Sequence, residues 1–217
     1  MNFLSHYYFE RCPDSYITVG LAIPDLVKHF SKTYNGTLKN AVVPTDVLLS
    51  EIHRGVLWHY DADKHFHSSA DFTELCKLLV ALFLKEGLDR QKIRLSVVAH
   101  IAIELMLDGC IVRYDKTIAD RYYQTLQATD LAVLATYFDE FGLSIEKQHF
   151  LRSFQSFMQR KFIFLLDNSE NVVLGLEKIY GSVAGIKFTE VEKKQLLTSL
   201  HNMESHLRYS WQQLLKK

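Results

Sequence analysis

The stretch GVLWHYDADKHFH, residues 55–67, places two imidazoles and one carboxylate at intervals of four residues. His59, Asp63 and His67 share one face of a helix if residues 45–67 are continuous, because residues four apart are neighbours on a helix surface. Imidazole nitrogens and carboxylate oxygens are common ligands of divalent cations. The spacing therefore predicts a stripe that is able to hold a metal ion.

A second stripe has the same spacing in VVAHIAIELMLDG, where His100, Glu104 and Asp108 are four residues apart. Its neighbours are strongly apolar, so we expect this helix to be largely buried. Buried carboxylates are costly unless they are paired or bound to a cation. Two such stripes supply three or more nitrogen and oxygen donors without loops, which favours a metal site.

The alternative for either stripe is a structural hydrogen-bond network, in which the histidine and the carboxylate pair with lysines or tyrosines. Spacing alone does not separate the two interpretations. Five other histidines lack a carboxylate pattern in an apolar setting, and we interpret them as surface residues: His53, His65, His149, His201 and His206.

The elements that must position these residues are predicted to be helices. Only three prolines and nine glycines interrupt the chain, and apolar residues recur between them every three or four positions, which is typical of amphipathic helices. We expect an all-α fold, a single-domain multi-helix bundle over residues 1–217. The predicted helices, with boundaries good to a few residues, cover 2–11, 15–31, 45–66, 70–86, 90–113, 117–141, 145–166, 169–182 and 189–215, and KTYNGTLKN is the long polar loop.

Several helix ends have local signals. Ser15 and Thr45 are expected at helix starts, and Thr189 with Glu192 has capping-box spacing. Glycine takes the left-handed C-cap conformation without steric penalty. Helices are therefore expected to stop at three glycines, Gly36, Gly87 and Gly142.

Pro24 lies within the otherwise helical SYITVGLAIPDLVKHF. A proline there removes a backbone hydrogen bond and crowds the carbonyl four residues earlier, so we expect a kink or break just before Asp25. The plainer alternative is a helix that starts again at Pro24. Asp25 is then either an acid that suits the helix dipole or a ligand.

Composition narrows the classes of protein. Basic and acidic residues balance at 25 each, and three cysteines, Cys12, Cys76 and Cys110, show no metal or redox spacing. The charge balance gives no general attraction to nucleic acid, and the odd cysteine count argues against a disulfide framework. The opening residues lack a signal-peptide pattern, and no apolar stretch approaches the ~20 residues that span a bilayer. We expect a cytoplasmic protein that binds neither nucleic acid nor membrane, and the oligomeric state is open.

Common catalytic motifs are missing from the sequence. It has no glycine-rich phosphate loop, no nucleophile-elbow serine, no HExxH and no CxxC pair. Any catalysis is therefore expected from the histidine and carboxylate stripes.

Three segments, MNFLSH, GLAIPD and GVLWHYDADKHFH, together resemble the bacterial acyl carrier protein phosphodiesterases. That family begins Met-Asn-Phe-Leu-Ala-His, has a glycine followed five residues later by an aspartate, then Gly-x-x-x-His-x-x-x-Asp-x-x-x-Asp, and later Asp-x-x-x-Asp-His. Six positions of this chain match: His6, Gly20, Asp25, Gly55, His59 and Asp63. The chain departs from the pattern at His67, where the family has an aspartate, and at His100-x-x-x-Glu104-Leu105, where it has Asp-x-x-x-Asp-His.

The resemblance implies an all-helical fold similar to the HD-type metal-dependent phosphohydrolases. It also implies hydrolysis of the bond between a carrier-protein serine and 4'-phosphopantetheine, a reaction connected with fatty acid biosynthesis. One or two cations would activate the water, with Asp25, His59 and Asp63 as the catalytic residues. The implied ligands are His6, Asp25, His59, Asp63, His100 and Glu104, and the second choices, as ligands or as residues that orient them, are His67 and Asp108.

The implied cofactor is a divalent metal. Nitrogen donors in place of oxygen donors favour manganese, iron or zinc over magnesium, and manganese is the first expectation. Acyl carrier protein is the implied partner, and four basic residues near the site in sequence would face it or simply be solvated: Lys28, Lys32, Lys39 and Arg54. The alternatives are a phosphohydrolase of a small phosphate or nucleotide, and a non-catalytic helical binding protein.

Overall fold

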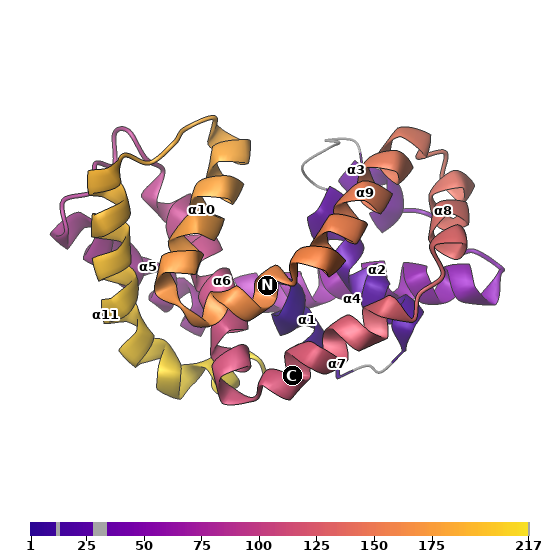
Figure 1. The fold of residues 1–217 in the computed structure, drawn as a ribbon, viewed down its shortest axis with the longest axis horizontal. Coiled ribbons are helices and arrows are strands. Elements are labelled where there is room, and N and C mark those ends of the chain that lie inside the picture. The colour runs from indigo at the N-terminus through magenta and orange to yellow at the C-terminus, as the bar shows by residue number, and fades with distance from the viewer. Residues whose placement is uncertain (12–13, 28–33, 217) are drawn as a thin grey trace. The chain divides into compact units, whose positions relative to one another are not determined.

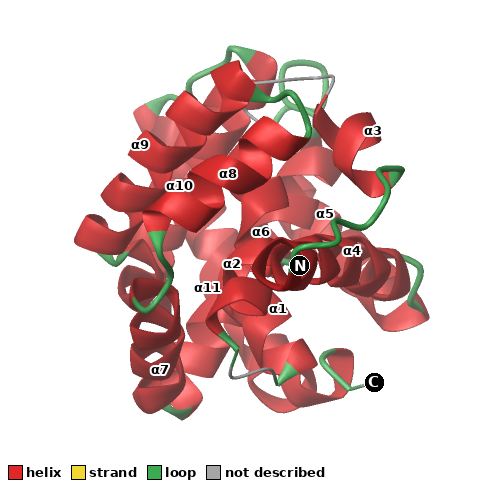
Figure 2. Cartoon of the chain, turned by 90° about the vertical axis from the view of Figure 1, so that its right-hand side faces the viewer, coloured by secondary structure: helices red, strands yellow, loops and turns green. Residues whose placement is uncertain are grey.

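The structure is a computed structural model that describes residues 1–11, 14–27 and 34–216, with the side chains of residues 34–36 and Val183 left aside. The described residues form α-helices and one short 3₁₀ helix, and no strand occurs among them (Figures 1 and 2). The all-α prediction is confirmed.

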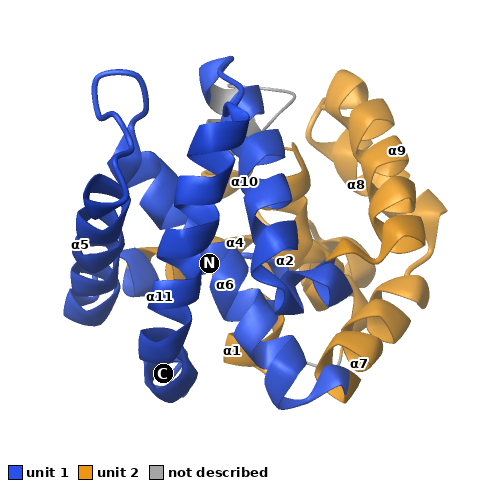
Figure 3. Cartoon of the chain, turned by 60° about the vertical axis from the view of Figure 1, so that its left-hand side comes forward, with its two compact units in different colours: residues 1–5, 65–116, 163–217 blue, residues 6–64, 117–162 orange. Residues whose placement is uncertain are grey.

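The described chain divides into two compact units (Figure 3). Unit 1 comprises residues 1–5, 65–116 and 163–217, and unit 2 comprises residues 6–64 and 117–162. The helices of unit 1 are α5 (Ala70–Lys85), α6 (Leu95–Tyr114), η1 (Phe162–Asp167), α10 (Ser169–Ala184) and α11 (Glu190–Leu214). Those of unit 2 are α2 (Ser15–Val27), α3 (Tyr34–Lys39), α7 (Lys116–Gln127), α8 (Leu131–Glu140) and α9 (Ser144–Arg160), while α1 (Phe3–Glu10) and α4 (Val47–His67) contribute residues to both. One domain over residues 1–217 stays a prediction.

The core of unit 1 is built around α6, which packs against α5, α10 and α11 (Figure 1). Its side chains are buried around most of the helix, including Val98, Ile103 and Leu107. A helix that is apolar on all sides gains free energy only when neighbours cover every face. The two polar residues Glu104 and Asp108 therefore lie on a core helix, as their apolar neighbours predict.

The same helix corrects one expectation about membranes. Among the described helices, α6 is long and apolar enough to cross a bilayer, although the sequence analysis found no such stretch. In the structure, 72% of its most apolar window is buried inside the protein. Core helices of globular proteins pass the same length and hydropathy test.

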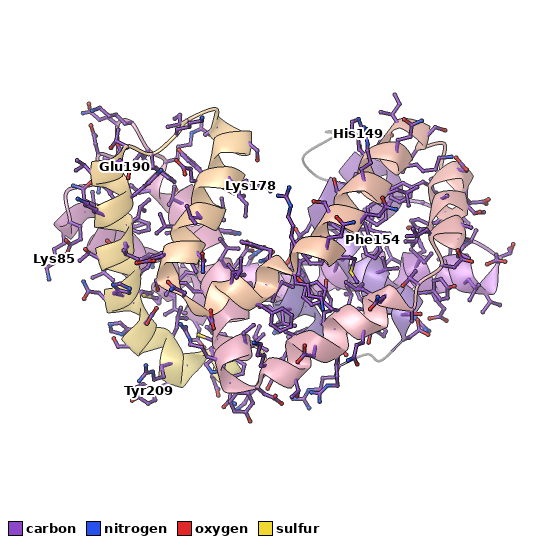
Figure 4. The ribbon with its side chains drawn as sticks, in the orientation of Figure 1. Lys85, His149, Phe154, Lys178, Glu190 and Tyr209 are labelled. Atoms are coloured by element: carbon purple, nitrogen blue, oxygen red, sulfur yellow. The ribbon has the colours of Figure 1, made fainter. Side chains whose placement is uncertain are left out.

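The core of unit 2 forms where α2 and α8 pack against α9. Phe138, Phe150 and Phe154 line this contact, with ring centroids 4.9 and 5.6 Å apart for successive pairs. Phe154 lies on α9 in Figure 4 and is buried. By contrast, Tyr209 extends away from α11 of unit 1 and is 86% exposed (Figure 4).

Some of the predicted helix ends are confirmed. Thr189 and Glu192 form the full capping box at the start of α11, and Gly87 and Gly142 follow helices with φ of +90° and +67°. At the starts of α2 and α4 the neighbouring aspartates do the capping instead. Asp14 accepts hydrogen bonds from the Tyr16 and Ile17 amides, and Asp46 accepts one from the Leu49 amide. The expected helix start at Ser15 is confirmed, although Asp14 and not Ser15 is the cap, and α4 starts at Val47, two residues after Thr45.

Other element predictions were wrong in type or length. The polar loop contains α3, and Gly36 lies inside it rather than at a helix end. The predicted helix 117–141 is two helices, because Asp130 caps a new start by accepting a hydrogen bond from the Ala132 amide. The predicted helix 145–166 ends at Arg160, after which η1 follows. Part of the predicted 15–31 helix, residues 28–31, lies outside the described residues, as does Cys12.

The break expected at Pro24 does not occur. Helix α2 runs from Ser15 to Val27 with Pro24 inside it. Residues 17–25 of this helix are all buried, and tertiary packing of this kind stabilises a helix more than local propensity does. Only about one turn follows the proline, so few backbone hydrogen bonds depend on it.

Candidate metal centre

Two glycines let helices α2 and α4 touch backbone to backbone in unit 2. A Cβ atom on Gly20 would lie 2.2 Å from the Ile52 carbonyl oxygen, and one on Gly55 would lie 2.2 Å from the Ile17 carbonyl oxygen. No larger residue fits either position without a backbone shift. The crossing brings main-chain atoms of α2 within reach of side chains on α4.

One result of this crossing is a hydrogen bond that fixes the ring of His59. Its Nδ1 atom lies 2.8 Å from the carbonyl oxygen of Leu21, and the side chain is 3% exposed. A carbonyl oxygen only accepts, so Nδ1 carries the proton. In the neutral ring Nε2 then presents a lone pair. This pattern, one nitrogen held by a backbone carbonyl and the other free, is typical of histidines that bind metals.

His6, on α1, lies directly beside His59. The two rings stack with centroids 4.0 Å apart and planes inclined by 24°. The side chain of His6 is fully buried, and among the described residues neither of its ring nitrogens has a hydrogen-bond partner of good geometry. Burial, and then the neighbouring His59, lower the pKa of His6 to about 4. His6 is therefore neutral near pH 7 and is able to offer a lone pair.

Asp63 completes this group. Its Oδ1 atom lies 3.2 Å from Nε2 of His6, and Oδ2 lies 3.4 Å from Nε2 of His59. Burial would raise the pKa of this carboxyl, but the two imidazoles hold it well below its usual range. Ligand atoms about 2.0–2.1 Å from a tetrahedral cation are separated by about 3.3 Å. The two separations from Asp63 are close to this value, and one donor atom from each of the three residues lies within 4.8 Å of the other two. We refer to His6, His59 and Asp63 as the buried triad.

Asp25 lies outside the buried triad, although it was expected among the ligands. It is 7% exposed in the last turn of α2, and no group of three converging metal-ligating atoms among the described residues includes it. Burial raises the pKa of Tyr60 to about 12, with further contributions from the charges of Asp25 and Asp63. Both carboxylates therefore lie close enough to Tyr60 to act on its hydroxyl.

The other expected ligands form a separate group in unit 1. His67, His100 and Glu104 converge there, with Nε2 of His67 2.9 Å and Nε2 of His100 3.2 Å from the same Glu104 oxygen. We refer to them as the open triad, because the side chains of His67 and His100 are 31% and 39% exposed. Five of the six predicted ligands are thus divided between two groups, and His67, a second choice, joins the open triad, while Asp25 belongs to neither.

Asp108, the other second choice, has a different set of contacts. Its Oδ1 atom accepts hydrogen bonds from the Ser5 amide (2.8 Å) and hydroxyl (2.6 Å), and Oδ2 accepts one from the Leu4 amide (3.1 Å). These donors belong to the first turn of α1, whose amides have no partner within the helix. Asp108 is fully buried, and burial raises its pKa to about 7 against the effect of these donors. In the structure it serves as a cap for α1.

Sequence reasoning missed two polar aromatic residues of α4, His53 and Tyr60. His53 was expected at the surface, but it is fully buried and its Nδ1 lies 3.1 Å from the hydroxyl of Tyr137. Tyr60 was not considered at all. His65, His201 and His206 are exposed, as expected, whereas His149 is half-buried beside Arg152. The burial of His53 could have been predicted from the apolar residues near it in the sequence, Ile52 and Val56.

Comparison of the chain with protein-family models, with characterised proteins and with solved structures finds no match.

Proposed function

We propose that this chain is a metal-dependent phosphodiester hydrolase whose divalent cation is held by the buried triad. The observation that carries the proposal is the hydrogen bond from His59 Nδ1 to the Leu21 carbonyl. It leaves the Nε2 lone pair directed at the same group as Asp63 and His6. A carboxylate and a lone pair 3.4 Å apart repel each other unless a cation or a proton lies between them.

The competing explanation is a structural ion pair in which His59 is protonated and donates to Asp63. His6 argues against a purely structural role for the triad. Nδ1 of His6 is buried without a hydrogen bond among the described residues, and Nε2 has only the Asp63 oxygen at 3.2 Å, outside hydrogen-bond geometry. An unpaired buried group costs roughly 1–3 kcal/mol. A metal ion bound through Nε2 of His6 would offset part of that cost.

A divalent cation at this position would lower the pKa of a coordinated water and neutralise charge that develops on phosphoryl oxygens. The other steps of hydrolysis, which are binding of substrate and orientation and deprotonation of the water, are assigned to residues of the protein. Asp63 is 26% exposed, so it is the member of the triad that faces solvent and substrate. Asp25 lies outside the ligand group, and we assign it the acceptance of a proton from the attacking water. The hydroxyl of Tyr60, close to both carboxylates, orients that water.

The resemblance at residues 1–6, 20–25 and 55–63 supports holo acyl carrier protein as the substrate, with release of 4'-phosphopantetheine in the cytoplasm. Lys39 is the basic residue best placed for the phosphate, because its Nζ lies 5.8 Å from the ring centroid of Tyr60. Arg54 instead pairs with Glu51 and covers the ring of Trp58. Lys28 and Lys32 lie outside the described residues. Two nitrogens and one oxygen suit manganese, iron or zinc, and manganese stays the first candidate.

The test is hydrolysis by the metal-loaded protein. Purified protein with Mn²⁺ should hydrolyse bis(4-nitrophenyl) phosphate, and should remove 4'-phosphopantetheine from holo acyl carrier protein, measured as a mass loss of the carrier. Asp63→Asn and His59→Ala should each lower kcat/KM by at least about 100-fold, since each removes a ligand. His65→Ala, an exposed histidine on the same helix, is the matched control and should retain wild-type rates.

The outcomes separate the alternatives. Turnover of the generic diester without mass loss of the carrier would exclude the carrier-protein substrate and favour a small phosphate or nucleotide. Absence of both activities, together with metal-independent stability of the wild type, would overturn the enzyme proposal in favour of a non-catalytic helical protein.

A further inference from the structure

Unit 1 contains a second convergence of metal-ligating atoms that the proposed hydrolysis does not use. His67 is the last residue of α4, and His100 and Glu104 lie one turn apart on α6. The two imidazoles approach one carboxylate oxygen from different helices, at 2.9 and 3.2 Å. Their rings lie 4.5 Å apart between centroids. Three donors from two separate helices are thus brought to one point.

The positions of these rings are set by packing. Phe72 of α5 is buried and contacts both imidazoles, with its ring centroid 5.3 Å from that of His67 and 5.0 Å from that of His100. The ring of Phe66 packs against Phe72, with centroids 4.5 Å apart, and lies 5.5 Å from the ring of His67. Donors held in place by an aromatic wall lose little conformational entropy on binding an ion. The open triad is therefore preorganised.

We infer that His67, His100 and Glu104 form a second divalent-cation site, selective for zinc or a similar late first-row ion and open to solvent. The donor set of two imidazoles and one carboxylate matches the preferences of such ions. The two separations between an imidazole nitrogen and the carboxylate oxygen, 2.9 and 3.2 Å, are close to the value of about 3.3 Å for a tetrahedral ion. Three protein ligands leave one coordination position for water, and the exposure of both imidazoles lets solvent reach it.

A cation that binds at the open triad must replace the positively charged group that already contacts Glu104. Glu104 is 13% exposed, and the α-amino nitrogen of Met1 lies 3.0 Å from the same oxygen that the imidazoles approach. A cation that enters the open triad takes over this contact. Binding is therefore expected to be exchangeable, in contrast to the buried triad, where His6 and His59 are 0% and 3% exposed.

The inference does not depend on the proposed hydrolysis. The open triad belongs to different residues and a different unit from the buried triad, and it requires no reaction. The competing explanation is a polar cluster without a metal ion, in which Glu104 is satisfied by the two imidazoles and by the α-amino group of Met1, which also lies 3.4 Å from Nε2 of His67. These two explanations predict different metal stoichiometries.

The experiment is equilibrium dialysis of the full chain against Zn²⁺, with bound metal measured by mass spectrometry, and a parallel titration with Co²⁺ followed by its visible d–d absorption. The wild type should bind one ion more than the His67→Ala/His100→Ala double variant, and His65→Ala should bind as many ions as the wild type. The tetrahedral Co²⁺ absorption of the wild type should be weaker in the double variant by the contribution of the open triad.

A variant with a side chain of similar shape controls for the chance that the double variant fails to fold. Glu104→Gln keeps the volume of the side chain and removes its charge, and it should weaken the second binding event by at least about tenfold. His59→Ala should lose an ion while keeping the Co²⁺ signal of the open triad, which separates the two sites. Unchanged stoichiometry and an unchanged spectrum in a folded double variant would overturn the inference.

Discussion

The imidazole rings of His6 and His59 stack in unit 2 with their centroids 4.0 Å apart. Two protonated imidazoles at this separation would repel strongly in a buried setting. Burial and this neighbour lower the pKa of His6 to about 4, so the folded protein keeps His6 neutral where an unfolded chain would begin to protonate it. The contribution of this pair to the stability of the fold therefore depends on pH, and this dependence can be measured in the absence of metal.

The first prediction concerns stability against pH. In the unfolded chain His6 binds a proton below its ordinary pKa of about 6.5, whereas in the folded chain it binds one only near pH 4. The free energy of unfolding therefore decreases as the pH falls between these two values. In EDTA, the difference in the free energy of unfolding between wild type and His6→Gln should shift against the wild type by about 2 kcal/mol between pH 7 and pH 5.

Urea denaturation at the two pH values measures this difference. Because the wild type and His6→Gln share all other titrating groups, the contributions of those groups to the free energy of unfolding cancel in the comparison. Asp108 is one such group, because its raised pKa makes stability fall as the pH rises from about 4 to about 7. A difference that does not change with pH would show that His6 titrates normally in the folded protein.

The second prediction concerns the crossing of α2 and α4. A methyl group at position 55 would lie 2.2 Å from the Ile17 carbonyl oxygen and 2.9 Å from the Gly20 Cα. Gly55→Ala should therefore lower the free energy of unfolding by about 1–3 kcal/mol and, by moving α4 relative to the Leu21 carbonyl, weaken metal binding at the buried triad. Thermal melts and metal titration measure the two effects.

Gly181 provides the matched control for this substitution. It also lies within a helix, but an added Cβ would have its nearest contact at 3.4 Å, from the Ile186 carbonyl oxygen. Gly181→Ala should be neutral or stabilise the protein by up to about 1 kcal/mol through helix propensity. Equal effects of the two substitutions would contradict a specific role for the crossing.

The third prediction concerns Asp108 and the start of α1. Removing its carboxylate leaves the Leu4 amide, the Ser5 amide and the Ser5 hydroxyl buried without their acceptor. Asp108→Ala should cost about 2–4 kcal/mol of stability, measured by urea denaturation. Asp108→Asn retains one acceptor oxygen and should recover part of the loss. Comparable stability of Asp108→Ala and the wild type would mean that water replaces the carboxylate.

The sequence predicted the parts of the fold that depend on local patterns. Apolar spacing predicted the helices, and the Thr189 capping box and the positive φ of Gly87 and Gly142 followed from side-chain chemistry. The helix break within 117–141 was not predicted, because the apolar spacing continues across the break and the cap that starts the new helix is a single residue, Asp130. At Pro24 the local rule predicted a break, and burial of the surrounding helix prevailed.

The sequence predicted which residues belong to the candidate metal sites, but not how they are grouped. Spacing of four placed His59 with Asp63 and His100 with Glu104, and both pairs lie together in the structure. Spacing could not show that His6 joins the first pair and His67 the second, because those contacts are made between helices far apart in sequence. The Leu21 carbonyl had no signal at all, since every residue carries one.

The last prediction concerns Cys76 on α5, whose thiol reports the charge of the open triad. Burial, and then the charge of Glu104, raise its pKa to about 12. Because the thiolate is the reactive form, alkylation of Cys76 at pH 8 should be roughly a thousandfold slower than that of a free cysteine. Glu104→Gln removes the nearby charge and should accelerate the reaction, whereas His65→Ala should not. Peptide mapping by mass spectrometry assigns the label to Cys76, and full labelling in urea confirms that the thiol is intact. A rate equal to that of a free cysteine in the folded wild type would contradict both the burial of the thiol and its coupling to Glu104.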